Sequence, residues 1–180
     1  MASLINSAGA TGTGSMTIQG PNTNSNQVLT IPDATGTAMV SGNMPAFSAY
    51  FNGSQSVTVA TFTKFTANTK SFDTANCYNT STYRFTPTVA GYYQFTFNVL
   101  GTGTGLVDFV ATIYKNGANA GYGAFVTYGG GVSLATILLY MNGTTDYVEP
   151  YVFINAASSA SAIGDGNSYG LFQGCLVRAA

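Results

Sequence analysis

The segment from Tyr93 to Val99 alternates strictly between apolar and polar side chains. The apolar positions are Tyr93, Phe95, Phe97 and Val99. Successive side chains of a strand point to opposite faces, so this pattern predicts an antiparallel strand with one buried face. Pro87 cannot donate to a strand ladder, and Gly91 is a turn residue. We therefore expect the strand to begin after Pro87.

The chain from Phe47 onward continues as short strand patterns separated by turn residues. We expect strands near 47–51, 57–66, 82–86, 91–100, 106–114, 132–141, 146–154 and 169–178. Asn52-Gly53, Lys115-Asn116-Gly117 and Asn142-Gly143 supply residues that tolerate positive φ in tight turns. No segment has a convincing helical period. Many short strands with glycine-rich turns predict an all-β sandwich or jelly roll.

Two of these strands are apolar on both faces. Between 134 and 140, the two faces carry Leu134, Leu138 and Tyr140 on one side and Ala135, Ile137 and Leu139 on the other; between 147 and 154, they carry Tyr147, Tyr151 and Phe153, and Val148, Val152 and Ile154. A two-layer sandwich has a solvated outer face, so such strands need a second cover. We expect this cover to be a subunit interface, with Tyr147, Tyr151, Phe153, Ile137 and Leu139 as interface candidates. The alternative is a cover made by the protein's own loops or its N-terminal segment.

Charged residues are unusually scarce, at 6% of the chain against about 25% in ordinary globular proteins. Few charges keep protomers apart, which favours a stable oligomer. The five Lys and Arg residues are spread singly, so nucleic-acid binding has no support. No apolar run of 18 residues and no signal-like N-terminus occurs, so we expect neither a membrane segment nor a Sec-type signal peptide.

Residues 1–44 differ in composition from the rest of the chain. All 24 aromatic residues lie at or after Phe47, and residues 1–44 hold only short alternating pieces followed by Pro21 and Pro32. Such pieces cannot bury a core alone, so they need a partner. We therefore expect an extended N-terminal arm over 1–44 and a folded domain over 45–180.

Catalytic chemistry has little support in the sequence. The chain contains no histidine, which removes the commonest general base and the commonest metal ligand. Asp146 and Glu149 are three positions apart on a strand, so they point to opposite faces and make a poor acid pair. We therefore assign no catalytic, cofactor-binding or metal-binding residue, and we expect a protein that is not an enzyme. Structural calcium, held by Asp146 and Glu149 or by Asp165-Gly166-Asn167, is a less favoured alternative.

Smaller features concern recognition and the cysteines. Four aromatic residues in loop contexts could stack on a host glycan or receptor, or pack between subunits: Tyr122, Phe125, Tyr128 and Tyr169. The glycine runs 101–105 and 129–131 lack the helix and Lys-Ser/Thr of a phosphate cradle, so we interpret them as flexible loops. Cys77 and Cys175 lack metal or redox spacing, and free thiols are favoured over a disulfide.

A series of short motifs runs in order through residues 45–180. They are Phe47-Ser48-Ala49, Phe72-Asp73, Tyr83-Arg84-Phe85-Thr86-Pro87 leading to Gly91-Tyr92-Tyr93-Gln94-Phe95, Ile113-Tyr114-Lys115-Asn116-Gly117, Leu138-Leu139 with Asn142-Gly143 and Asp146-Tyr147-Val148, and Phe172-Gln173-Gly174-Cys175-Leu176-Val177. In this order they resemble the jelly-roll family of the complement globular head and tumour necrosis factor. The resemblance implies a jelly roll of about ten strands that assembles as a tight homotrimer around an apolar axis.

Residues 11–41, with Leu29-Thr30-Ile31-Pro32-Asp33, are similar to segments of bacteriophage tail fibres. Together the two resemblances imply a noncatalytic structural protein on the virion surface, either a capsid decoration protein or a tail-fibre head. Its partners would be sister copies and another virion protein that holds residues 1–44. The alternative is an adhesin module that binds a host receptor or glycan during host attachment. An enzyme such as a depolymerase is the third hypothesis.

Overall fold

The alternating segment around Tyr93 forms the longest strand in the described part of the protein. The computed structural model describes residues 24–26, 28, 39, 40, 42, 44–127 and 131–180. Strand β7 (Gly91–Gly103) buries Tyr93, Phe95, Phe97 and Val99 completely. The predicted one-sided strand is therefore confirmed.

The first sheet is built around β7 and is antiparallel throughout. Its strand order is β2 (Asn52–Val57), β13 (Ala160–Asp165), β7, β14 (Leu171–Ala179), β1 (Ala46–Tyr50) and β4 (Thr69–Asp73), and β11 (Ser133–Met141) also pairs with β7. The first strand of the domain thus lies beside the last, with Phe47 opposite Gly174.

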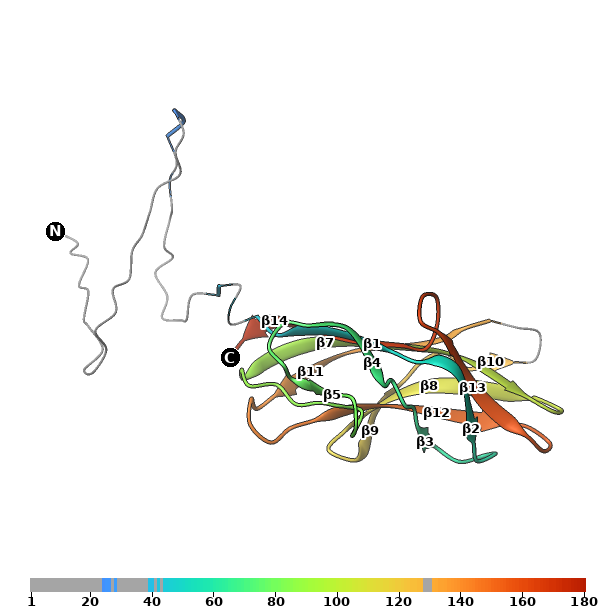
Figure 1. Ribbon diagram of the computed structural model, residues 1–180. Coiled ribbons are helices and arrows are strands. Elements are labelled where there is room, and N and C mark those ends of the chain that lie inside the picture. The colour runs from blue at the N-terminus through green and yellow to red at the C-terminus, as the bar shows by residue number, and fades with distance from the viewer. Residues whose placement is uncertain (1–23, 27, 29–38, 41, 43, 128–130) are drawn as a thin grey trace. The chain divides into compact units, whose positions relative to one another are not determined.

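The second sheet lies beneath the first (Figure 1). Its order is β10 (Val126–Thr127), β8 (Asp108–Lys115), β12 (Val148–Asn155), β6 (Arg84–Phe85) and β5 (Tyr78–Asn79); β3 (Thr63–Lys64) pairs with β12, and β9 (Ala118–Tyr122) pairs with β8. The predicted two-layer all-β architecture is confirmed. No helix among the described residues is long and apolar enough to cross a membrane.

Aromatic rings fill the space between the sheets. Eight of them are at most 1% exposed: Phe47, Phe65, Phe85, Tyr93, Phe95, Phe97, Phe109 and Phe172. Phe47 stacks on Phe85 at a centroid distance of 4.5 Å and meets Phe172 edge to face at 5.0 Å. Aromatic pairs add to the stabilisation from burial alone, so this cluster ties β1 and β14 to the second sheet.

The predicted strand over 57–66 is wrong. β2 ends at Val57 and β3 covers only Thr63–Lys64, because the chain turns between them with Ala60 at φ +53°. The prediction of a turn at Asn52-Gly53 is also wrong. Both residues belong to β2, where Gly53 pairs with Gly164. In contrast, Lys115-Asn116-Gly117 forms the predicted tight hairpin, with φ values of +52° at Asn116 and +80° at Gly117.

The glycine run that begins at Gly101 is not a flexible loop over its first part. Gly101 and Gly103 belong to β7, and a Cβ atom at Gly101 would lie 2.4 Å from Cγ of Phe109. Glycine is needed there because the two sheets approach closely. Most of the predicted arm lies outside the described residues, so the arm stays a prediction; the chain divides into units 1–36 and 37–180.

Candidate functional site

The outer face of the first sheet carries apolar side chains that no described segment covers. On β11, Leu134, Leu138 and Tyr140 are 49%, 52% and 45% exposed, while the alternate positions Ala135 and Met141 are buried. Three more exposed apolar residues lie on β4, β7 and β14: Phe72, Tyr92 and Val177. We call these six residues the exposed sheet face.

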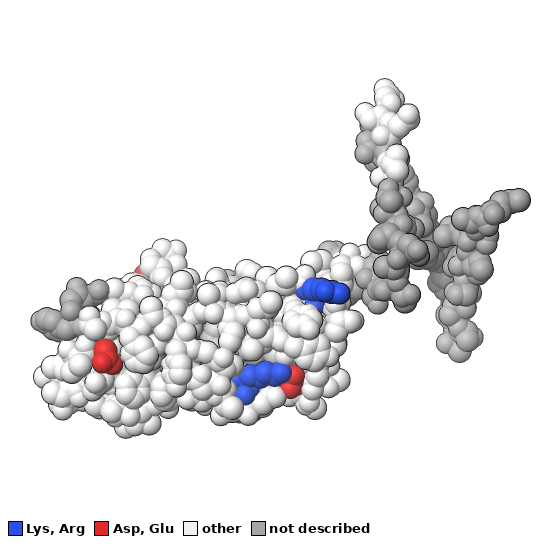
Figure 2. Space-filling view, turned by 180° about the vertical axis from the view of Figure 1, so that it is seen from behind, with Lys and Arg blue, Asp and Glu red and all other residues white. Residues whose placement is uncertain are grey.

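The exposed sheet face has almost no charge. Of the strands that form it, β1, β7, β11 and β14 carry one charged residue, Arg178, and β4 carries Lys70 and Asp73, which pair with each other. Neutral polar groups lie between the apolar ones, and Gln94 donates to Thr136 at 2.6 Å. A shallow hollow of about 280 Å³ lies on this face, with Phe72, Gln94 and Gln173 among its lining residues. Figure 2 shows how few charged side chains the molecule presents on one side. Covering such a face is favourable because it removes apolar surface from water and requires the desolvation of few charges.

The other doubly apolar strand, β12, has a cover from its own chain. The turn after β2 places Phe62 over the outer face of the second sheet, with ring-centroid distances of 5.0 Å to Phe153 and 6.1 Å to Tyr114. The amide of Ala60 donates to the carbonyl of Ile154 at 2.8 Å and holds this turn in place. The second cover of β12 is therefore partly formed by a loop of the same chain, which is the alternative given above to a subunit interface.

The structure does not bring the five interface candidates together. Tyr151 and Phe153 lie on β12 in the second sheet, and Tyr147 lies just before that strand. Ile137 and Leu139 lie on β11 in the first sheet, but their side chains pack against the core. The apolar positions of β11 that face outward are the alternate ones, Leu134, Leu138 and Tyr140. A role in an interface for the five stays a prediction.

Glu149 is the most deeply buried carboxylate among the described residues, at 1% exposure. It accepts a hydrogen bond of 2.7 Å from Nε of Arg84 and also pairs with Nζ of Lys64. Arg84 lies over the ring of Tyr147, with Cζ 4.1 Å from the centroid. The hydrogen bond to Glu149 raises the pKa of Arg84. Two cations around one carboxylate leave an excess of one positive charge at this place.

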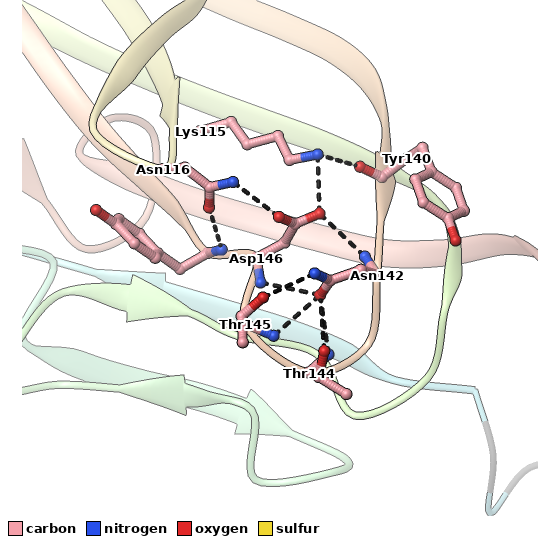
Figure 3. Close-up of polar contacts among 8 residues, drawn as sticks. Lys115, Asn116, Tyr140, Asn142, Thr144, Thr145 and Asp146 are labelled. Carbon is pink, nitrogen blue, oxygen red and sulfur yellow. Dashed lines mark hydrogen bonds and ion pairs between the residues drawn. The ribbon is translucent and has the colours of Figure 1, made fainter.

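Asp146 holds the β11–β12 loop against the β8–β9 hairpin (Figure 3). Its Oδ1 accepts from Nδ2 of Asn116 at 2.7 Å, and its Oδ2 lies 2.9 Å from Nζ of Lys115. The side-chain oxygen of Asn142 accepts the amides of Thr144, Thr145 and Asp146. The hydrogen bond from Asn116, followed by those from Lys115 and the Asn142 amide, lowers the pKa of Asp146.

Four of the acidic residues, Asp73, Asp146, Glu149 and Asp165, have separate structural roles. Asp73 accepts the amides of Cys77 and Tyr78 and pairs with Lys70. Oδ1 of Asp165 accepts three amides of its own loop, which lowers its pKa to about 2. Asp146 and Glu149 share no partner. Within the described ranges, no group of three His, Cys, Asp or Glu residues could hold a metal ion.

Two of the four predicted recognition aromatics lie together. Tyr122 and Phe125 are 55% and 59% exposed, with ring centroids 6.3 Å apart. Tyr169 is half-buried and belongs to the separate loop capped by Asp165. Tyr128 lies outside the described residues. Both cysteines are free thiols, with Cys77 buried and Cys175 exposed.

Neither the Arg84–Glu149–Lys64 cluster nor the cover by Phe62 was predicted from the sequence pattern. Arg84 and Glu149 are 65 positions apart in the sequence, so no local spacing of residues predicts their contact. A usable signal was the charge of Glu149 itself, inside a strand that is otherwise apolar on both faces. A buried carboxylate in such a strand needs a cation, and only five cations exist in the chain.

Comparisons with known proteins show which fold these elements form. Neither the family models nor the curated proteins gave a match. Among solved structures, the chain is similar to the globular domain of zebrafish complement 1qA, at 18% identity and a TM-score of 0.51, over 76% of this chain and 98% of that one. It is similar to the vertex protein P5 of phage PRD1, at 12% identity and a TM-score of 0.52, over 74% and 73%. The chain therefore has the antiparallel jelly-roll fold.

Proposed function

We propose that this protein is a noncatalytic structural protein of a bacteriophage particle, displayed as a homotrimer on the virion surface. The exposed sheet face is the observation that carries the proposal. Its six apolar side chains are between 44% and 58% exposed, and five of them lie on β7, β11 and β14, whose one charged residue is Arg178. A sheet face with this many exposed apolar side chains is typical of an interface, and its few charges favour sister copies as the cover.

The shape of this face supports a closed ring of copies. Leu134, Leu138 and Tyr140 project from β11, whereas the hollow lined by Phe72 and Gln173 lies over β4, β1 and β14. A projection and a hollow are different patches, so their contact is heterologous, and a heterologous contact that closes produces a cyclic oligomer. A threefold ring agrees with the assembly that the sequence resemblance implies.

A virion location is supported by two independent observations. The fold is shared with the PRD1 vertex protein P5, and residues 11–41 resemble tail-fibre segments. In this proposal, residues 1–44 bind another virion protein and the jelly roll faces outward, either as a capsid decoration or as a tail-fibre head.

The absence of catalysis is part of the proposal. Asp73, Asp146, Glu149 and Asp165 each hold backbone amides or cations, so these four carboxylates serve the fold. Without histidine, neither the exposed thiol of Cys175 nor any hydroxyl has an imidazole base.

Light scattering and particle imaging test the proposal. The purified full chain is expected to have three times the mass of 18.6 kDa, and imaging should place it at multiple copies on the particle. Deleting residues 1–36 is expected to preserve the trimer and to abolish incorporation into particles. A monomer at all concentrations would contradict the assembly, and incorporation of the deletion variant would contradict the anchoring role.

A second function is an adhesin module that binds a host receptor or glycan. The exposed pair Tyr122 and Phe125 favours it, because adjacent exposed aromatic rings are suited to stacking on sugars or on a receptor. Binding of the full chain to a glycan array that is lost in Tyr122→Ser and Phe125→Ser would support this function over pure decoration.

A further inference from the structure

A polar hollow lies beside Arg84 and is formed within one protomer. Its volume is about 320 Å³, at the small end of ligand pockets. Neutral polar residues make up much of its lining: Asn76, Asn79, Thr82 and Thr86. The strands β5 and β6 that carry it belong to the second sheet, not to the exposed sheet face. The hollow therefore does not depend on the proposed trimer.

Arg84 is held in a fixed orientation at this hollow. Nε donates a hydrogen bond to the buried carboxylate of Glu149, and Cζ of the guanidinium lies over the ring of Tyr147. Throughout the described residues, neither terminal nitrogen of Arg84 has a hydrogen-bond partner in the protein. An arginine anchored through Nε and stacked on a ring keeps its Nη1–Nη2 edge available for a planar anion, and it loses little freedom on binding one.

The charges around the hollow favour an anion. Arg84 is the charged residue among those that line the hollow, and it shares the carboxylate of Glu149 with Lys64. Two cations therefore face one carboxylate and leave an excess of one positive charge. One surplus charge suits a monoanion better than a multiply charged group. The amides and hydroxyls of the lining add neutral donors and acceptors, which suit the hydroxyl groups of a sugar.

We infer that this hollow binds the carboxylate of an acidic sugar, such as a uronic acid residue of a host glycan, on the terminal nitrogens of Arg84. The lining of Asn79, Thr82 and Thr86 contacts the sugar hydroxyls. This inference goes beyond the structural role proposed above, because a decoration protein needs no ligand site.

Two substitutions and one matched control test the site. Arg84→Gln removes the anion-binding edge. Asn79→Asp leaves the Arg84–Glu149 pair intact, and its new carboxylate can still accept the amides of Ser81 and Thr82, as the Asn79 side chain does at 2.8 and 3.0 Å. It places a negative charge in the hollow. Asn119→Asp makes the same chemical change at an exposed position of β9, outside the hollow.

Titration of the ¹⁵N-labelled full chain with D-glucuronate, followed by NMR, is the measurement. We expect saturable shifts at residues 79–86, no saturable shifts with D-glucose, and an affinity at least about tenfold lower in Arg84→Gln and Asn79→Asp, as the loss of a charge-assisted contact predicts. Asn119→Asp should bind like the parent protein. Absence of saturable binding, or equal binding by Asn79→Asp, would overturn the inference. Equal affinity for acetate, or tighter binding of inorganic phosphate, would overturn the assignment to an acidic sugar. The mass by light scattering is measured in parallel, so that a failed assembly is distinguished from a failed site.

Discussion

Tyr92 and Tyr140 meet edge to face across β7 and β11, with ring centroids 5.6 Å apart. Both rings are nearly half exposed, at 44% and 45%. The pair therefore forms part of the surface rather than the core. An aromatic pair that remains this accessible is well suited to pack against a second protein surface.

Leu138→Asp is expected to dissociate the trimer without unfolding the protomer. Leu138 is 52% exposed beside Tyr140, so the new carboxylate is hydrated in the monomer but would be buried in the assembly. Light scattering over a dilution series should give the monomer mass, while circular dichroism stays unchanged. The control is Val107→Asp, at an exposed position before β8, which should remain trimeric. A trimer in both variants would mean that another surface holds the copies together.

Phe153→Ala is expected to lower protomer stability instead of weakening assembly. Phe62 packs on Phe153 at a centroid distance of 5.0 Å, so truncation opens a gap between the turn and β12. We expect a loss of about 2 kcal/mol in the free energy of unfolding, below the range for a fully buried phenylalanine because the ring is half-buried. Urea unfolding of Phe62→Ala, Phe153→Ala and the double variant should reveal coupling of about 1 kcal/mol. Additive losses would exclude a direct contribution of the contact.

Gly101→Ala is expected to destabilise the sandwich by about 1–3 kcal/mol through overpacking. A Cβ atom there would lie 2.4 Å from the ring of Phe109, so either the ring or β7 must shift. Gly42→Ala is the control, because no atom lies within 4 Å of an added Cβ. Thermal unfolding of both variants measures the difference. Equal midpoints would mean that the sheets can separate at this point without cost.

Asp146→Asn tests the contribution of charge in the loop network. The folded protein lowers the pKa of Asp146 below its ordinary value of 3.8, chiefly through Asn116, so folding favours the ionised form. This stabilisation is complete above the ordinary pKa and is lost as the pH falls through the lower folded value. At about pH 7 we expect the variant to be less stable by about 1–3 kcal/mol, and the difference should shrink below about pH 4. Urea unfolding at several pH values measures it, and a difference that does not vary with pH would contradict the role of the charge.

The sequence predicted those parts of the fold whose pattern is local and unambiguous. The alternation from Tyr93 to Val99 specified both a strand and its buried side, and Asn116-Gly117 specified a hairpin. The strand over 160–165 was missed because Ala160-Ser161-Ala162 carries little hydrophobic signal, although it pairs with both β2 and β7. Small residues are chosen there by close packing, which a one-dimensional pattern does not report.

The candidate site was predictable only in part. The apolar residues on both sides of β11 correctly indicated that its outer face is apolar, but their alternation cannot say which side faces the core when both sides are apolar. Ile137 and Leu139 were chosen, whereas Leu134 and Leu138 are the exposed residues. Similarly, no residue near Tyr151 in the sequence predicts that Phe62 packs over β12. These outcomes depend on contacts between distant segments.

The antiparallel pairing of β1 with β14 has a consequence for synthesis. Ala46–Tyr50 lies against residues 171–175, so the first sheet cannot close until the final strand has left the ribosome. Until then β7 lacks its neighbour β14, and aromatic rings such as Phe47 are not yet covered by that strand. Nascent chains should therefore stay open and vulnerable to protease until β14 has been synthesised, and products that stop before Leu171 should be degraded.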